Sequence, residues 1–198
     1  MKSKEFNTSV SRIFGIPEKT ITVYTRLLKE AGLLTSGRGG RAAPDMTPLD
    51  AARMTIALLT CSGPSQAVER VKQFGPIPFL PNLSDFEHIT QAQFDERYEG
   101  ETLEEVLAFI FDRANDIGPD CKDWFIHNAF SLEMSDFSLS AELQIKLGEQ
   151  RDIKFKTAVF MGDIKFPLPP PSSVIHTSRA ISLDTLYQLS LDLAGGEE

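Results

Sequence analysis

The sequence predicts an α+β fold in which a helical N-terminal part is followed by an antiparallel sheet covered by helices. Apolar residues recur at helical spacing up to about residue 117, and beyond it they alternate with polar residues at the period of a strand. With 198 residues, 41% of them hydrophobic, the chain is long enough to bury a core without disulfides or metals.

The first two helices are predicted from the residues at their ends. Asn7 and Thr8 are cap-type residues ahead of a short apolar helix, which Gly15 ends. A second helix follows over residues 17–31, with proline in its first turn and Gly32 just past its end. About three residues therefore join the two helices.

Two more helices follow a basic, glycine-rich loop. Residues 33–45 contain three glycines and two arginines and are predicted to form a flexible hairpin or loop. Thr47 supplies a capping hydroxyl and Asp50 a carboxylate near the positive end of the next helix, which is predicted over 48–59. Residues 64–74 predict a further helix opened by a proline.

Charge divides the chain into a basic first part and an acidic remainder. Residues 1–74 carry 11 Lys and Arg against 6 Asp and Glu, a net charge of +5, whereas residues 75–198 carry 9 against 22, a net charge of −13. The two parts add up to the net charge of −8 for the chain. We therefore expect a polyanion-binding domain over 1–74, a proline-rich linker and irregular segment over 75–101, and an acidic α+β domain over 102–198.

The C-terminal part is predicted to begin with a helix and to continue with strands. Thr102 and Glu105 form a capping box ahead of that helix. Alternating residues then predict two or three antiparallel strands in a meander, a further short strand and a last helix. The expected ranges are 103–117 for the first helix, 130–134, 137–147, 153–161 and 174–181 for the strands, and 183–193 for the last helix. The two helices are the available cover for the apolar face of the sheet.

The second predicted helix has one apolar and one basic face. At about 100° per residue, the stripe that we expect to be buried contains Ile21, Tyr24, Leu28 and Ala31. The opposite side carries Lys19, Thr22, Arg26 and Lys29. Such a strip is usually a solvated face, but on a helix preceded by a short helix and a tight turn it has the layout of a recognition helix.

The segment from Gly15 to Leu34, GIPEKTITVYTRLLKEAGLL, resembles the helix-turn-helix of winged-helix transcription regulators. In that family a short helix leads into P/S-x-x-T-[VI], a hydrophobic pair and E-A-G-L-[LIV] before the wing. The matching residues are Ile16, Pro17, Thr20, Ile21, Leu28, Glu30, Ala31, Gly32, Leu33 and Leu34. The resemblance covers residues 7–45 and departs from the family at Thr25, where a core leucine is usual. Few residues precede the pair, so the helix over 48–59 would complete the three-helix core.

The resemblance implies a set of DNA-binding residues. The residues that would face the major groove or its flanking phosphates are Lys19, Thr20, Thr22 and Arg26, with Lys29 on the same basic strip. Arg38 and Arg41 would lie on the wing and touch the DNA backbone or the minor groove. One such head offers few base contacts, so we expect a homodimer on a two-fold symmetric site.

The sequence contains no motif for catalysis, for a cofactor or for a metal. His88, His127 and His176 are scattered without ligand spacing, and no serine lies in a G-x-S-x-G turn. The acidic residues between positions 95 and 105 are interpreted as a solvated face. We therefore expect no enzyme, and no bound cofactor or metal. Two distant cysteines and the lack of a long apolar segment predict a cytoplasmic protein that does not enter a membrane.

These observations together predict a sequence-specific DNA-binding transcriptional regulator, bacterial or from a phage, that binds double-stranded DNA. The acidic C-terminal domain would then supply the dimer contact, a ligand pocket or a surface for a protein partner. Two alternatives stay open: a DNA-recruiting component of a packaging or replication assembly, and a protein-interaction module whose winged helix binds no DNA. The mass of the protein in solution separates the first alternative from a dimeric regulator, and DNA binding separates the second.

Overall fold

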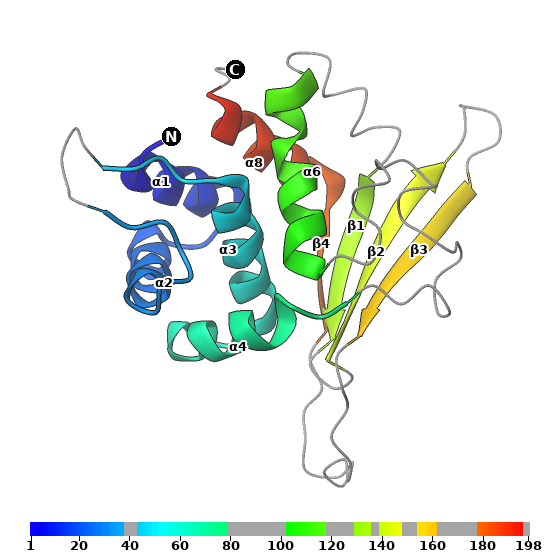
Figure 1. Cartoon of the computed structure of the whole chain (residues 1–198), viewed down its shortest axis with the longest axis horizontal. Helices are drawn as coiled ribbons and strands as arrows, with labels where there is room; N and C mark the ends of the chain where they lie inside the picture. Colours follow the sequence, from blue (N-terminus) through cyan, green and yellow to red (C-terminus); the bar gives the residue numbers. More distant parts are fainter. Residues whose placement is uncertain are drawn as a thin grey trace, which may run out of the picture.

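The chain folds into a four-stranded antiparallel sheet with helices packed on one of its faces (Figure 1). This computed structural model describes residues 1–37, 43–78, 102–117, 129–135, 139–147, 154–161 and 178–195. The predicted α+β class is confirmed.

The helices of the described residues follow the predicted order. Their bounds are α1 (Ser3–Phe14), α2 (Glu18–Glu30), α3 (Pro48–Thr60), the 3-10 turn η2 (Pro64–Gln66), α4 (Ala67–Phe74), α6 (Leu103–Ile117) and α8 (Leu183–Ala194). The helices expected over 17–31, 48–59, 103–117 and 183–193 are confirmed to within one residue at each end. The helix expected over 64–74 is also present, but its first turn is the 3-10 turn.

Helix α1 begins well before Asn7 and Thr8, so the prediction that these residues cap it is wrong. The cap is formed one turn earlier, where the backbone N–H of Lys2 donates to Oε2 of Glu5 at 2.8 Å. Phe6, an apolar residue that precedes the expected start of the helix, is fully buried. The side chain of Asn7 is instead buried inside the helical layer.

The turn between α1 and α2 is three residues long, as predicted. Gly15 ends α1 with φ 65°, and Gly32 follows α2 with φ 70°, a backbone conformation in which glycine is strongly favoured because it lacks a Cβ atom. Pro17 stands at the N-cap of α2, immediately before the first helical turn. Both glycines therefore act as the expected helix ends.

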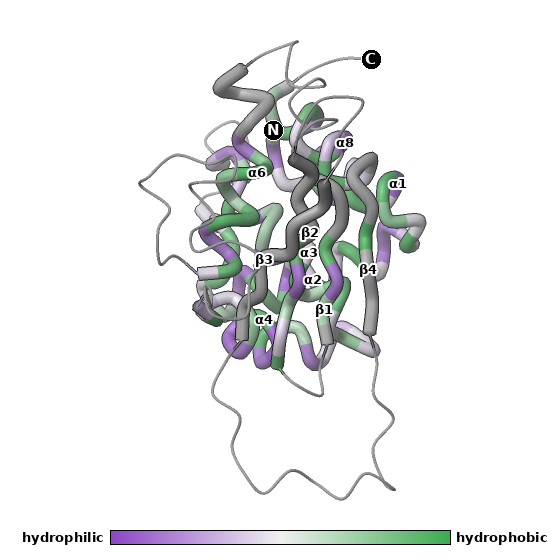
Figure 2. The backbone as a smooth tube through the Cα atoms, turned by 90° about the vertical axis from the view of Figure 1, so that its right-hand side faces the viewer, coloured by the Kyte–Doolittle hydropathy of each residue, from purple (hydrophilic) through white to green (hydrophobic). Residues whose placement is uncertain are grey.

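The sheet consists of β1 (Ala129–Ser135), β2 (Ser140–Leu147), β3 (Lys154–Met161) and β4 (Ser178–Ser182). The strand order is β3-β2-β1-β4, and each neighbouring pair is antiparallel. Figure 2 shows the four strands side by side, with the helices behind them. The predicted meander is confirmed, and the short last strand pairs with β1.

The two faces of the sheet differ in polarity, as the alternation predicted. The buried pairs across β1 and β2 are Leu132 with Leu143 and Met134 with Ala141. Between them, Glu133 lies opposite Glu142, and both are exposed. The apolar side chains therefore face the helices and the glutamates face solvent.

The turn before β2 departs from the prediction of a strand over 137–147. Leu139 has φ 45°, in the left-handed region, and the strand begins only at Ser140. Leu139 is partly buried against the core, so its apolar character serves packing at the turn and not a strand face.

Residues 75–78, expected to open a linker, pack against the start of α6. The N–H of Leu103 donates to the backbone oxygen of Ile77 at 3.0 Å, and the side chain of Ile77 is buried. Residues 79–101 lie outside the described residues. The division of the chain into three parts stays a prediction.

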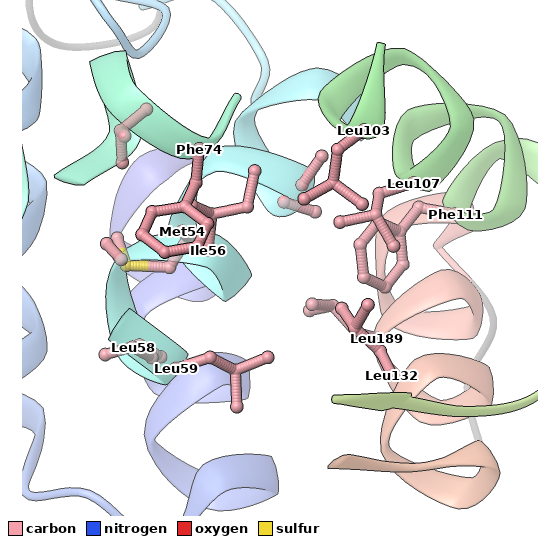
Figure 3. Packing of buried hydrophobic residues seen from close by; sticks show 14 of the residues in the cluster. Met54, Ile56, Leu58, Leu59, Phe74, Leu103, Leu107, Phe111, Leu132 and Leu189 are labelled. Carbon is pink, nitrogen blue, oxygen red and sulfur yellow. The ribbon is translucent and has the colours of Figure 1, made fainter. Parts of the chain in front are cut away.

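Helix α3 is the central element of the core. Ten of its thirteen residues are buried, which requires neighbours on nearly all sides. It packs against α4 and α6 and also touches β1 and β4. Figure 3 shows the two sides of this core. One side consists of Met54, Ile56, Leu58 and Leu59 of α3 and Phe74 of α4. The other side consists of Leu103, Leu107 and Phe111 of α6, Leu189 of α8 and Leu132 of β1. The cover of the sheet thus includes α3 besides the two predicted helices.

Candidate nucleic-acid interface

Helix α2 lies at the edge of the molecule, with one face packed and one face open (Figure 1). Its buried residues are Ile21, Tyr24, Thr25 and Leu28. Three of them belong to the predicted stripe, whereas Ala31 at the end of the helix is only half-buried. We call the opposite side, formed by Lys19, Thr22, Arg26 and Lys29, the basic face. Lys19, Thr22 and Arg26 are exposed and Lys29 is half-buried.

Thr20 does not share this basic face. At about 100° per residue it lies roughly 160° from Thr22 around the helix, and it is half-buried. The resemblance had grouped it with the groove-facing residues. A DNA surface that contacts Thr22 and Arg26 would therefore reach Thr20 only at the edge of the helix.

A buried hydrogen bond locks α2 against α1. Oγ1 of Thr25 donates to Oδ1 of Asn7 at 2.7 Å, and the side chains of both residues are buried. Each polar group supplies the partner that the other needs away from water. This bond explains how threonine can occupy a position where the resembled family has leucine, and it fixes the rotation that turns the basic face outward.

The same asparagine reaches the basic face. Nδ2 of Asn7 donates to Oγ1 of Thr22 at 3.5 Å, and that hydroxyl donates in turn to the backbone oxygen of Glu18 at 2.9 Å. Sequence reasoning did not select Asn7 for this role. A polar Thr25 beside an apolar stripe was the available signal, since a buried hydroxyl needs a partner on the neighbouring helix.

The charges of the basic face are largely available to a ligand. Arg26 approaches Glu30 at 3.8 Å, but both side chains are about two-thirds exposed, with relative accessibilities of 66% and 65%. Such a pair contributes little and is easily exchanged for another partner. Within the described ranges, Lys19 and Lys29 form no ion pair.

Three other cations of the N-terminal part are engaged in ion pairs. The distances are 3.2 Å for Lys2 with Asp45, 2.8 Å for Arg12 with Asp192, and 2.9 Å for Arg53 with Glu104. Hydrogen bonds to Glu104 raise the pKa of the Arg53 guanidinium above its ordinary value. Hydrogen bonds from Lys2 and then from the N-terminal ammonium lower the pKa of Asp45. The pair of Arg53 with Glu104 is the most shielded from water and ties the N-terminal helices to α6, whereas Lys2 and Arg12 are more exposed. All three cations are already engaged with a carboxylate.

Arg38 and Arg41, expected on the wing, lie outside the described residues. The chain is anchored on both sides of them: the N–H of Thr35 donates to Oδ1 of Asp50 at 2.7 Å, and Nζ of Lys2 donates to the backbone oxygen of Ala43 at 2.6 Å. Within 33–37 and 43–47 the structure has no strand. The winged helix-turn-helix head therefore stays a prediction.

A shallow hollow of about 440 Å³ lies between the start of α3 and α6. It is lined by Thr47, Pro48, Leu49, Glu105, Ala108, Phe109 and Asp112. Oε2 of Glu105 is used at the start of α6, where it accepts hydrogen bonds from the N–H and the hydroxyl of Thr102 at 2.9 and 2.6 Å. These two bonds confirm the predicted capping role of Glu105. Glu105 and Asp112 also make the lining of the hollow acidic, which disfavours binding of phosphate.

No protein-family model, curated protein or solved structure matches the chain. In the described part of the chain, no group of three or more histidine, cysteine, aspartate or glutamate side chains could hold a metal ion. No helix among the described residues has the length and apolar character needed to span a membrane. Among the described residues, the basic face of α2 is the candidate interface.

Proposed function

We propose that the protein is a sequence-specific DNA-binding transcriptional regulator whose recognition helix is α2. In this proposal the basic face enters the major groove of double-stranded DNA, Arg26 contacts a base edge, and Lys19 and Lys29 contact phosphates. Arg38 and Arg41 contact the backbone or the minor groove. The protein acts as a homodimer in the cytoplasm and binds no cofactor.

One observation carries the proposal: the basic face is presented by a helix that is rigidly held from behind. The packed side of α2 buries three apolar residues and a hydrogen bond to α1, so the rotation of the helix is determined by the core. A short helix and a three-residue turn precede it. Recognition helices need this combination, because base readout requires side chains held in one orientation before DNA arrives.

The dimer follows from the amount of surface that one helix can offer. A single α2 places few side chains at base edges, and each good bidentate contact discriminates by about 1–3 kcal/mol. Two copies on a symmetric site double that number. The acidic C-terminal part supplies the dimer contact, a ligand pocket or a surface for a protein partner.

A second candidate function is a protein-interaction module that binds no DNA. The observation that favours it is Val23, which is 36% exposed on α2 and stands out as a large exposed hydrophobic residue among those described. The charges of α2 also nearly balance, since three cations accompany Glu18 and Glu30. A DNA-recruiting component of a packaging or replication assembly is a third candidate that the mass in solution would identify.

The test is selection of DNA sites from a randomised duplex library by the purified full-length protein. We expect enrichment of a two-fold symmetric sequence by the wild-type protein, which sedimentation should show to be a dimer. Arg26→Ala should weaken binding to the selected site by about 5- to 150-fold per half-site and flatten the preference at one position of each half-site. Lys72→Ala on α4 is the control, since Lys72 lies outside the basic face.

Three results would contradict the proposal in different ways. Absence of enrichment together with absence of binding at low salt would favour the protein-interaction module. Equal weakening of all sequences by Arg26→Ala would mean that α2 lies along the DNA backbone. A large closed ring in solution would favour the assembly component.

A further inference from the structure

The hydroxyl group of Thr22 is already committed inside the protein. Oγ1 donates its single proton to the backbone oxygen of Glu18 at 2.9 Å, one turn earlier in α2. Nδ2 of Asn7 approaches the same oxygen at 3.5 Å as a donor. Because a threonine hydroxyl has one proton, Thr22 has none to offer a ligand while this bond lasts.

Asn7 is held in the orientation that this arrangement requires. Its side chain is only 7% exposed, and its Oδ1 accepts the hydroxyl proton of Thr25 at 2.7 Å. With the oxygen of the amide bound to Thr25, the NH₂ group is the end that faces Thr22. Releasing the Thr22 hydroxyl would break its bond to Glu18 and its contact with Asn7, which is itself held by the buried bond to Thr25.

The commitment of the hydroxyl limits what Thr22 can recognise. Phosphate oxygens, guanine O6 and N7 and thymine O4 are all acceptors, which need a donor, so the Thr22 hydroxyl could accept only from the amino groups of adenine or cytosine. The Thr22 side chain is nonetheless exposed on the basic face, and its Cγ2 methyl group, unlike Oγ1, takes no part in these hydrogen bonds. Thymine is the base that presents a methyl group in the major groove.

Given the DNA-binding function proposed above, on which this step rests, we infer that Thr22 reads thymine through its methyl group. Arg26, whose guanidinium donates hydrogen bonds, then contacts a neighbouring base that carries acceptor atoms. The half-site contains a thymine whose C5-methyl group contacts Cγ2 of Thr22. The hydroxyl group contributes to the position of the methyl group and does not itself touch the DNA.

The test compares two matched variants on DNA with and without one methyl group. The probes are the duplex selected by the full-length wild-type protein and copies in which one thymine at a time is replaced with deoxyuridine. Thr22→Val keeps a methyl group and removes the hydroxyl, whereas Thr22→Ser keeps the hydroxyl and removes the methyl. Affinities are measured by fluorescence anisotropy, and thermal unfolding confirms that both variants are folded.

For the wild-type protein and Thr22→Val, deoxyuridine at one position of each half-site should lower affinity about fourfold per half-site, as expected for loss of one buried methyl contact. Thr22→Ser should bind both duplexes equally. The inference is overturned if Thr22→Ser keeps the preference and Thr22→Val loses it, or if no thymine is sensitive to the replacement. Failure of the wild-type protein to bind any duplex at low salt would instead reject the DNA-binding function itself.

Discussion

Replacing Glu104 with alanine should destabilise the folded protein, because this residue joins the N-terminal helices to α6. Oε2 and Oε1 of Glu104 accept hydrogen bonds from Nε and Nη2 of Arg53 at 2.9 and 3.1 Å. Nη1 of the same arginine donates to the backbone oxygen of Leu33 at 3.0 Å. The two charged side chains are 22% and 18% exposed, so most of the pair is shielded from water.

The magnitude follows from this intermediate burial. An exposed pair contributes about 0–1 kcal/mol, and breaking a fully buried pair costs about 3–5 kcal/mol. For the two-point contact between Arg53 and Glu104 we expect Glu104→Ala to lower the free energy of unfolding by about 2–3 kcal/mol. Glu69→Ala on the exposed face of α4 is the control and should change it by less than about 0.5 kcal/mol.

A double-mutant cycle in urea separates the pair from its surroundings. Arg53→Ala should cost at least as much as Glu104→Ala, because it also leaves the Leu33 carbonyl without its donor. The coupling energy from the double variant should be about 1.5–3 kcal/mol. A coupling below about 0.5 kcal/mol would refute the reasoning, since it would mean that the pair acts as a surface contact.

Three further changes test the core and its charges. Leu143→Asp should cost about 3 kcal/mol or more in urea unfolding because the side chain is fully buried, while Glu142→Asp on the exposed face should be nearly neutral; equal effects would mean that the faces are misassigned. Thr55→Val should leave stability unchanged or raise it by about 1 kcal/mol, because within the described residues the buried Thr55 hydroxyl has no hydrogen-bond partner; a loss above about 1 kcal/mol would contradict this. Because Lys2 lowers the pKa of Asp45, the carboxylate stabilises the folded protein above its ordinary pKa, and this contribution fades as the pH falls below about 4 through the folded-state pKa. The difference in stability between the wild-type protein and Asp45→Asn should therefore shrink in acid. A difference that grew in acid would show that the pKa of Asp45 is not lowered in the folded protein.

Local patterns predicted most of the secondary structure, because they depend on residues close in sequence. The capping box at Thr47 is present, with the N–H of Asp50 donating to its hydroxyl at 3.2 Å and Asp50 accepting from the N–H of Thr47 at 2.7 Å. The alternation that placed Leu132 and Leu143 on one face of the sheet needed only the two-residue period. The apolar stripe of α2 likewise followed from helical spacing.

The predictions failed where a side chain finds its partner far along the chain. Glu104 belongs to an acidic stretch that was interpreted as a solvated face, but its partner Arg53 lies 51 residues earlier. Asn7 has the character of a helix cap, but it bonds Thr25 across the helix pair. Single-sequence patterns carry no information about such contacts. The central position of α3 was detectable in principle, because its residues are apolar on almost every side.

The most direct test of the proposed function is the salt dependence of DNA binding by two charge-matched double variants of the full-length protein. Lys19→Gln with Arg26→Gln removes two charges from the basic face, and Arg70→Gln with Lys72→Gln removes the same two charge types from α4. In the proposed complex Lys19 of each of the two protomers contacts a phosphate, so we predict that the α2 variant reduces the slope of log affinity against log salt by about 2 for the dimer, whereas the α4 variant leaves the wild-type slope unchanged. Equal slopes for the two variants, or a larger loss from the α4 variant, would contradict the assignment of α2 as the DNA-binding helix.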